Sequence, residues 1–242
     1  MHDLQHFSLR DMTDLGAALR SAAQDAGSME EAAGRIVGHL RTSLVVAPTG
    51  SPACVLARLY KTHLYRDLDP ELQAFARRAA AGALLPENLR CLTLLATAGD
   101  RPEWCSRAAS KGHRAIPLLS EAMVRAVPMV SRLLHQFGLE VREMLAPDPA
   151  FLRQKGQATC NVFYVPEARG SEYIPAQEDF VVPAGVRSVL GFGGILPSGS
   201  LFAVILFCRV PVPEATADQF KTLALNVKLA LLPHDAGRVF AP

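Results

Sequence analysis

Residues 191–210, GFGGILPSGSLFAVILFCRV, constrain the fold more than any other part of this 242-residue chain. Two apolar runs flank the turn-forming residues 197–200, a pattern typical of a β-hairpin with buried strands. The three glycines at the start also raise the alternative of a phosphate-binding loop. A Walker loop needs a lysine after its last glycine, and a dinucleotide fingerprint needs a glycine at its sixth position before a helix. Position 196 is leucine and a strand-like run follows, so the pattern favours a hairpin whose glycines permit bending or close approach.

The remaining patterns predict an α+β domain around this hairpin. Two helices are predicted near the N-terminus, and Ser28 and Glu31 form a capping box for the second of them. Asp69 followed by Pro70 is a typical helix start. Pro128 is expected to kink a helix or to begin a new one. Gly138 is the expected end of that helix, and the last helix is expected to start at 213–216. Further strands are predicted at 53–64, 89–99, 112–118 and 158–168. We expect a central antiparallel sheet of five or six strands, with the N- and C-terminal helices packed on one face.

Composition limits the compartment and the partners. Lys and Arg total 25 and Asp and Glu total 23, so a formal charge of +2 gives no reason to expect nucleic acid or an anionic membrane as a partner. The first residues lack the apolar segment of a secretory signal, and the longest apolar run, 201–208, is far shorter than the roughly 20 residues that span a bilayer. The five cysteines form no C-x-x-C pair, which favours reduced thiols and a cytoplasmic protein.

Catalytic motifs are missing from the sequence. It has no G-x-S-x-G, no H-E-x-x-H and no Walker motif. We therefore expect no hydrolase, kinase or cyclase activity, and a binding module rather than an enzyme.

Three residues nevertheless carry possible cofactor chemistry. Cys105 lies in the polar stretch GDRPEWCSRAASKGHR, whose basic residues would favour a thiolate if they were close in space; the alternatives are a redox-active thiol and an ordinary surface cysteine. His113 and His135 could ligate a haem or another tetrapyrrole, because neutral imidazole is a common ligand, or could be hydrogen-bonded structural histidines. Cys105, His113 and His135 are the first candidates for any such cofactor, whose identity stays unassigned.

The order of predicted elements resembles that of a GAF domain: lead helix, strand, helix, two strands, a helical excursion, strand, hairpin and final helix. The likeness covers about residues 28–232. The segments PEWCSRAASKGHRAIPL, VPMVSRLLHQFGLEV, CNVFYVPEARGSEYIPAQEDFVVPAGVRSVLGFGG and FKTLALNVKLALLP are similar to the GAF-like sensory segment that precedes histidine kinase modules in some bacteria. The resemblance implies a signal-input module that binds a small molecule or cofactor and acts on a downstream signalling protein.

The same resemblance implies where a ligand would bind. A GAF pocket lies between the sheet and the helical excursion, here residues 104–138. The long aperiodic segment 167–182 is the expected lid, because its apolar and aromatic residues favour burial. The polar groups expected at this pocket are His113, Arg114, His135, Asn161, Tyr164 and Tyr173.

The last helix has two apolar stripes. One, which includes Phe220 and Val227, should cover the sheet. The second is formed by Leu225, Leu229 and Leu232, each of which would contribute about 1.5–3 kcal/mol if fully buried. We expect this leucine stripe to be buried in a bundle with the N-terminal helices, in the same chain or across a homodimer, an arrangement common in GAF-like sensors. Residues 1–27 are assigned to an N-terminal helix and 28–242 to the sensory domain.

Overall fold

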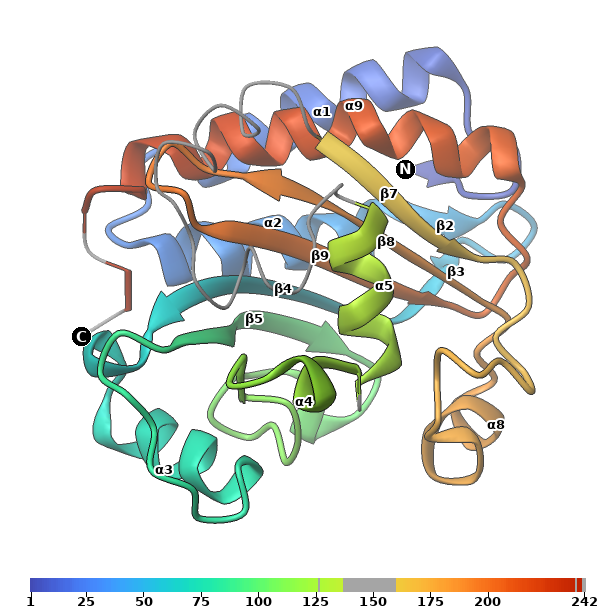
Figure 1. Cartoon of the computed structure of the whole chain (residues 1–242). Helices are drawn as coiled ribbons and strands as arrows, with labels where there is room; N and C mark the ends of the chain where they lie inside the picture. The colour runs from blue at the N-terminus through green and yellow to red at the C-terminus, as the bar shows by residue number, and fades with distance from the viewer. Residues whose placement is uncertain (126, 137–159, 238, 241–242) are drawn as a thin grey trace.

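A six-stranded antiparallel sheet forms the centre of the protein (Figure 1). The computed structural model describes residues 1–125, 127–136, 160–237 and 239–240. The sheet order is β6-β5-β4-β9-β8-β7, and every neighbouring pair is antiparallel. The strands are β4 (Cys54–Leu64), β5 (Arg90–Gly99), β6 (Ala115–Pro117), β7 (Cys160–Val165), β8 (Ser188–Ile195) and β9 (Leu201–Cys208). The predicted central antiparallel sheet is confirmed, and so is the hairpin formed by β8 and β9.

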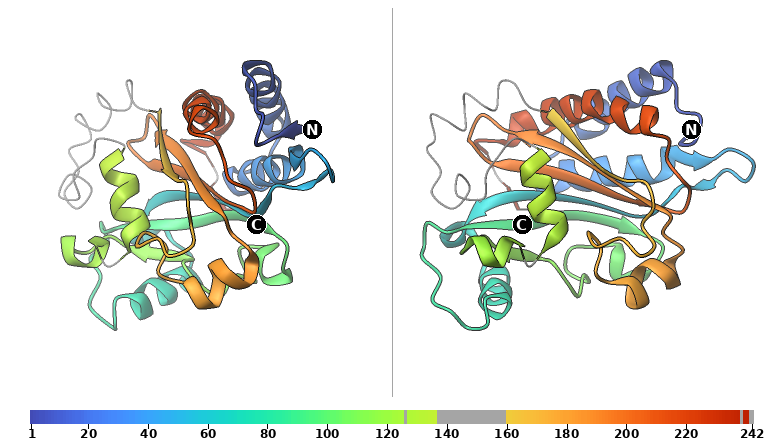
Figure 2. Two further views of the ribbon diagram at one scale, coloured as in Figure 1. Left: turned by 90° about the vertical axis from the view of Figure 1, so that its right-hand side faces the viewer. Right: turned by 45° about the vertical axis from the view of Figure 1, so that its right-hand side comes forward.

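Three helices lie on one side of the sheet, as the left view of Figure 2 shows. They are α1 (Leu9–Ala23), α2 (Met29–Ser43) and α9 (Glu214–Leu231). Helices α2 and α9 pack directly on the strands, and α1 packs on those two helices. Their apolar sides form one core with the sheet, in which Leu15, Leu40 and Phe220 are fully buried beside Phe192 of β8. The predicted placement of the N- and C-terminal helices on one face is confirmed. Within the described part of the chain, none of the helices combines the length and hydropathy that crossing a bilayer requires.

Shorter elements lie on or beside the opposite face. The helices there are α3 (Pro70–Ala79), α4 (Glu121–Arg125), α5 (Pro128–Gln136), the π-turn η3 (Gln177–Val181) and α8 (Val182–Ala184). Asp69 caps α3 as predicted, by accepting a hydrogen bond from the Leu72 amide. Pro128 begins a second helix rather than kinking a continuous one, and the helix end expected at Gly138 lies outside the described residues.

The termini and turns add small elements. A separate three-stranded sheet joins β1 (His2–Asp3), β2 (Leu44–Val46) and β3 (Ser51–Pro52). The 3-10 turns are η1 (Tyr65–Asp67), η2 (Pro102–Trp104) and η4 (Leu232–His234).

The leucine stripe of α9 faces solvent. Leu225, Leu229 and Leu232 are 47%, 46% and 40% exposed, so their expected contact with an N-terminal helix of the same chain is wrong. Helix α1 packs instead on another side of α9, where a Cβ at Gly16 would lie 2.7 Å from Nδ2 of Asn226. Because Gly16 has no side chain, the two helices approach closely there and α1 cannot also cover the leucines.

Candidate functional site

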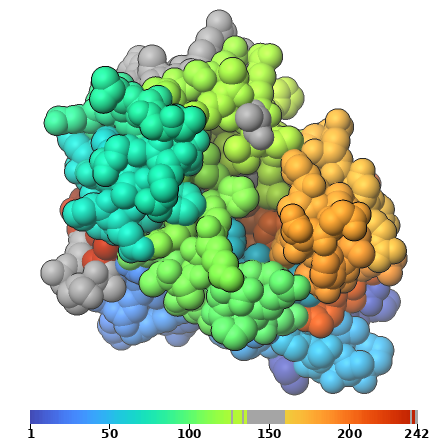
Figure 3. Space-filling model, turned by 90° about the horizontal axis from the view of Figure 1, so that it is seen from below, coloured from blue at the N-terminus to red at the C-terminus, as the bar shows by residue number. Residues whose placement is uncertain are grey.

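A cavity of about 450 Å³ lies on the face of the sheet opposite α1, α2 and α9. Figure 3, which views the molecule from below, shows a hollow between the green segment near residues 100–125 and the orange segment near 170–185. The lining comes from three parts of the chain: strands β4, β5 and β9, the segment from Trp104 to Val130, and the loop 173–180. This is the place that the GAF-like resemblance predicted, and its size falls within the usual range for small-molecule sites.

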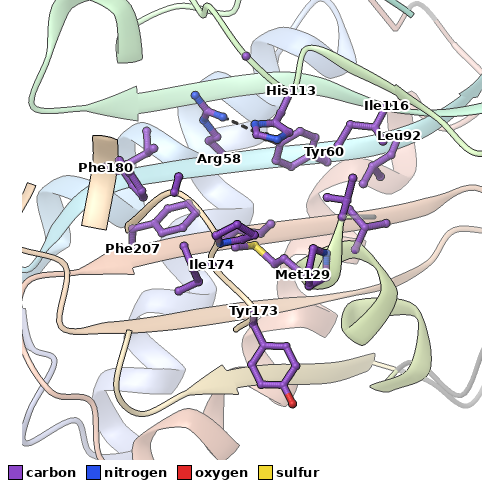
Figure 4. A pocket seen from close by; sticks show the side chains of 18 of the residues that line it. Arg58, Tyr60, Leu92, His113, Ile116, Met129, Tyr173, Ile174, Phe180 and Phe207 are labelled. Carbon is purple, nitrogen blue, oxygen red and sulfur yellow. Dashed lines mark hydrogen bonds between the residues drawn. The ribbon is translucent and has the colours of Figure 1, made fainter. Parts of the chain in front are cut away.

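One end of the cavity is polar. Arg58 and Tyr60 stand two residues apart on β4, so both side chains face the cavity. Arg58 donates from Nη1 to the Tyr60 hydroxyl at 3.2 Å and from Nη2 to Oγ of Ser110 at 3.1 Å. His113 completes this end, and Figure 4 shows its ring next to the Arg58 guanidinium. A charged, a phenolic and an imidazole group thus converge on one small region.

His113 is held in a costly backbone conformation. Its φ is +57°, in the left-handed region, where a residue with a side chain typically costs about 1–3 kcal/mol. His113 is an exposed residue at the edge of the cavity. Partial loss of hydration beside the cavity wall lowers the pKa of His113, and the positive charge of Arg58 lowers it further. At neutral pH the ring is therefore an uncharged imidazole, which can donate one hydrogen bond and accept another.

The rest of the cavity wall is apolar and closed by aromatic contacts. Phe180, from the loop, packs edge-to-face on Phe207 of β9 with ring centroids 4.9 Å apart, and on Trp104 at 5.5 Å. Trp104 can pack so closely on the sheet because position 99 is glycine, where a Cβ would lie 2.7 Å from Cβ of Trp104. Phe180 of the loop thus covers part of the cavity through its contacts with Trp104 and Phe207.

The side-chain amide of Gln177 fixes the shape of the lid. Its Nε2 donates to the carbonyls of Ala168 at 3.0 Å and Ile174 at 2.7 Å, and its Oε1 accepts from the Gly170 amide at 2.8 Å. The sequence predicts a lid at 167–182 but does not single out this residue. Ile174 and Val181 are buried as expected, at 3% and 0% exposure.

Two of the predicted binding residues, His113 and Tyr173, line the cavity. The Tyr173 ring forms part of the wall, but its hydroxyl points away from the polar end (Figure 4) and accepts a hydrogen bond from Arg132. Arg114 does not line the cavity, because its guanidinium bonds to Oε1 of Glu71 at 2.6 Å.

The other predicted residues lie elsewhere. His135 is exposed at the end of α5, and Asn161 accepts from the Val162 amide through Oδ1. Tyr164 packs on the core of the opposite face, where its hydroxyl donates to the Val212 carbonyl. Cys105 is exposed, and its thiol donates to the carbonyls of Gly99 and Arg101. None of these four borders the cavity.

The structure does not bring the three predicted cofactor ligands together. Of the three cofactor candidates, His113 borders the cavity, whereas Cys105 and His135 do not. Two of the basic neighbours of Cys105 are engaged elsewhere: the Arg101 guanidinium lies 4.7 Å from the centre of the Trp104 ring, and Arg107 pairs with Glu30 and Asp69. Among the described residues, no three His, Cys, Asp or Glu side chains gather to hold a metal ion. The three residues therefore do not fit one shared cofactor.

Sequence reasoning missed Arg58 and Tyr60. The signal was present, since Arg58 is a charged residue within the apolar strand segment CVLARLY. A strand buried on both faces has little room for a charge, so an arginine inside it marks a place where one face opens.

The structure repeats the order of elements that the GAF-like resemblance implied: α2, β4, α3, β5, β6, the α4–α5 excursion, β7, the β8–β9 hairpin and α9. The fold is GAF-like. No protein-family model matches the chain, and no curated protein matches it either.

Several solved structures are similar to the chain at low identity. The GAF domain of an Acinetobacter phosphoenolpyruvate-protein phosphotransferase is 15% identical with a TM-score of 0.47, covering 95% of this chain and 97% of that one. The phytochrome photosensory core module of Stigmatella aurantiaca is 13% identical (TM-score 0.43), and a bacteriophytochrome of R. palustris is 9% identical (0.43). This chain, matched over 96% of its length, spans 39% of each of these two. These similarities are weak, and the GAF-like fold rests on the element order and the sheet.

Proposed function

We propose that this chain is a sensory, signal-input module that binds a small molecule in the cavity beneath the 173–180 loop and acts in the cytoplasm. The observation that carries the proposal is the cavity itself: an apolar space of about 450 Å³ with a few polar groups gathered at one end. Ligand sites in proteins have this composition, because apolar walls supply affinity and a few fixed polar groups supply orientation.

We propose the same two segments that the sequence suggests, an N-terminal helix and a sensory domain. Residues 28–242 form the sensory domain, and residues 1–27 add a helix on its α9 side. We further propose that two copies associate through the exposed leucine stripe of α9, and that a downstream signalling protein reads the ligand state. Three leucines that are 40–47% exposed, two on α9 and one at its C-cap in η4, support an interface of this kind.

A neutral fluorescent probe, 1-aminoanthracene, tests the cavity without reference to charge. We expect it to bind with an increase in fluorescence. The Ile205→Trp variant should weaken binding at least tenfold, because Ile205 lines the cavity from β9 and a larger side chain would fill it. Met129→Trp, on the opposite wall, should act in the same way.

The matched control is Leu84→Trp, in which the same residue is introduced at a position that is 96% exposed. This variant should bind the probe like the unmodified protein. Equal binding by all three variants would show that the cavity is not the binding site and would reject the proposal.

A further inference from the structure

We infer that the ligand of this cavity is an amphipathic anion, an apolar aliphatic or aromatic body carrying one acidic headgroup that Arg58, Tyr60 and His113 receive. The inference rests on the proposed function, which it extends by naming the class of ligand. It comes from the partners of Arg58, the balance of charge at the cavity and the position of the polar groups.

The guanidinium of Arg58 has only neutral partners among the described residues. It donates to the hydroxyls of Tyr60 and Ser110. An arginine side chain has five N–H donors. The Nε of Arg58 is buried without a partner, so these two bonds leave two N–H groups on the terminal nitrogens for a ligand. Two other poorly exposed arginines pair with carboxylates, Arg114 with Glu71 and Arg107 with Glu30, whereas Arg90 bonds to Thr62 and the Gly199 carbonyl. Arg58 is half-buried at the cavity, and no ion pair joins it to an acidic side chain of the described residues.

The lining of the cavity does not neutralise this charge. The described residues that line it include no aspartate and no glutamate. His113 beside Arg58 is uncharged at neutral pH, as its lowered pKa indicates. The described lining therefore carries one net positive charge at the polar end, and an anion is the ligand that would complete it.

The remaining groups suit the same ligand. The Tyr60 hydroxyl accepts from Arg58 and keeps its own proton for an acceptor on the ligand. His113 can donate one N–H to the same oxygens. Beyond this end the walls are apolar, formed by Leu92, Ile116, Met129, Ile174, Phe180 and Phe207 (Figure 4). An acid with an apolar body matches both halves, whereas a uniformly polar anion would leave the walls unfilled.

The test compares ligands that share one eight-carbon body and differ in the headgroup. Octanoate, octyl phosphate, octan-1-ol and octylamine are titrated separately into the protein by calorimetry. We expect at least one of the two anions to bind at least tenfold more tightly than octan-1-ol, a difference of about 1.4 kcal/mol, and octylamine to bind most weakly. The two anions tell a carboxylate site from a phosphate site.

Variants assign the discrimination to its residues. Arg58→Met should reduce the preference for the anion to less than threefold, and Arg58→Lys should restore part of it by restoring the charge. Tyr60→Phe removes one hydroxyl and should weaken anion binding severalfold without changing the affinity for octan-1-ol. Arg125→Met is the control, because Arg125 is exposed on α4, does not line the cavity and pairs with Glu121. Circular dichroism melting confirms that each variant is folded.

The outcomes separate this inference from the proposed function. Equal affinities for anion and alcohol, no binding of either anion at millimolar concentration, or an unchanged preference in folded Arg58→Met would each overturn the inference. Binding of the neutral probe 1-aminoanthracene should not depend on the charge of Arg58, so failure of the anion preference leaves the proposed ligand site standing if the probe binds.

Discussion

At the scale of single residues, His63 on β4 is a titratable group almost fully removed from water. Its ring is 8% exposed and lies against Phe240, with centroids 5.3 Å apart. Burial lowers the pKa of His63 to about 3, and the positive charge of Lys61 contributes in the same direction. The unfolded chain keeps a pKa near 6.5. Between these two values the unfolded state binds a proton that the folded state does not, so stability falls as the pH drops below about 6.5.

The His63→Leu variant should lose this sensitivity to acid. Its free energy of unfolding should change with pH less steeply than that of the unmodified protein between pH 6 and 4, by up to about 1.4 kcal/mol per pH unit. Urea denaturation at several pH values measures the two slopes. The variant has no histidine to protonate at this position, so an unchanged slope would mean that His63 is already protonated in the folded protein or is not buried.

At the scale of elements, the β8–β9 hairpin depends on a glycine that permits close approach. Gly193 pairs with Ala203, and a Cβ at position 193 would lie 2.1 Å from the carbonyl oxygen of Phe202. The obstacle is backbone, which cannot rotate away as a side chain can. The glycines of the hairpin are thus explained, at this position, by contact between two strands and not by a ligand.

Two identical substitutions should therefore have opposite effects. Gly193→Ala should destabilise the protein by about 1–3 kcal/mol or more, because forcing extra atoms into a packed interior usually costs this much. Gly34→Ala, on the exposed side of α2 where a Cβ would meet no atom within 4 Å, should stabilise it by roughly 0.5–1 kcal/mol. Denaturant titration measures both. Two variants of equal stability would contradict the close approach of the strands.

At the scale of the whole molecule, the exposed leucine stripe is the feature that a monomer leaves unexplained. The proposed dimer would bury Leu225, Leu229 and Leu232, which the chain itself leaves 40–47% exposed. Size-exclusion chromatography with light scattering should give twice the chain mass of 26.1 kDa. The double variant Leu225→Lys, Leu229→Lys should weaken association about tenfold or more for each residue and give the monomer mass.

The control for this prediction is Leu84→Lys, which changes an exposed leucine outside the helices. It should keep the mass of the unmodified protein. A monomer at all concentrations for the unmodified protein, or a dimer that survives the double substitution, would reject the leucine stripe as the interface.

Much of the architecture is determined by signals that act between neighbouring residues. The cap at Asp69 and the turn between β8 and β9 follow from the backbone preferences of proline, glycine and capping side chains. Pro128 predicted an interruption of the helix, and the structure decides that a second helix begins there. The apolar runs of β4, β5 and β9 follow from the composition of buried strands. These signals need no knowledge of distant residues, and so the strands of the central sheet, expected to be five or six, could be predicted in their order along the sequence, whereas the small sheet of β1, β2 and β3 was not predicted.

The site was decided by contacts between segments distant in the sequence. His113 meets Arg58 and Tyr60 because the loop before β6 returns over β4, more than fifty residues earlier. Arg114 does not line the cavity because its guanidinium pairs with Glu71 on α3. Tyr164 faces away because successive residues of a strand point to opposite faces, and the register of β7 on β8 sends this one to the α9 side. Likewise, Gly16 and Asn226 set which side of α9 meets α1. The sequence by itself determined most of the helices and strands. Which side chains share the cavity was decided by strand register and helix packing, because these depend on contacts between residues far apart in the sequence.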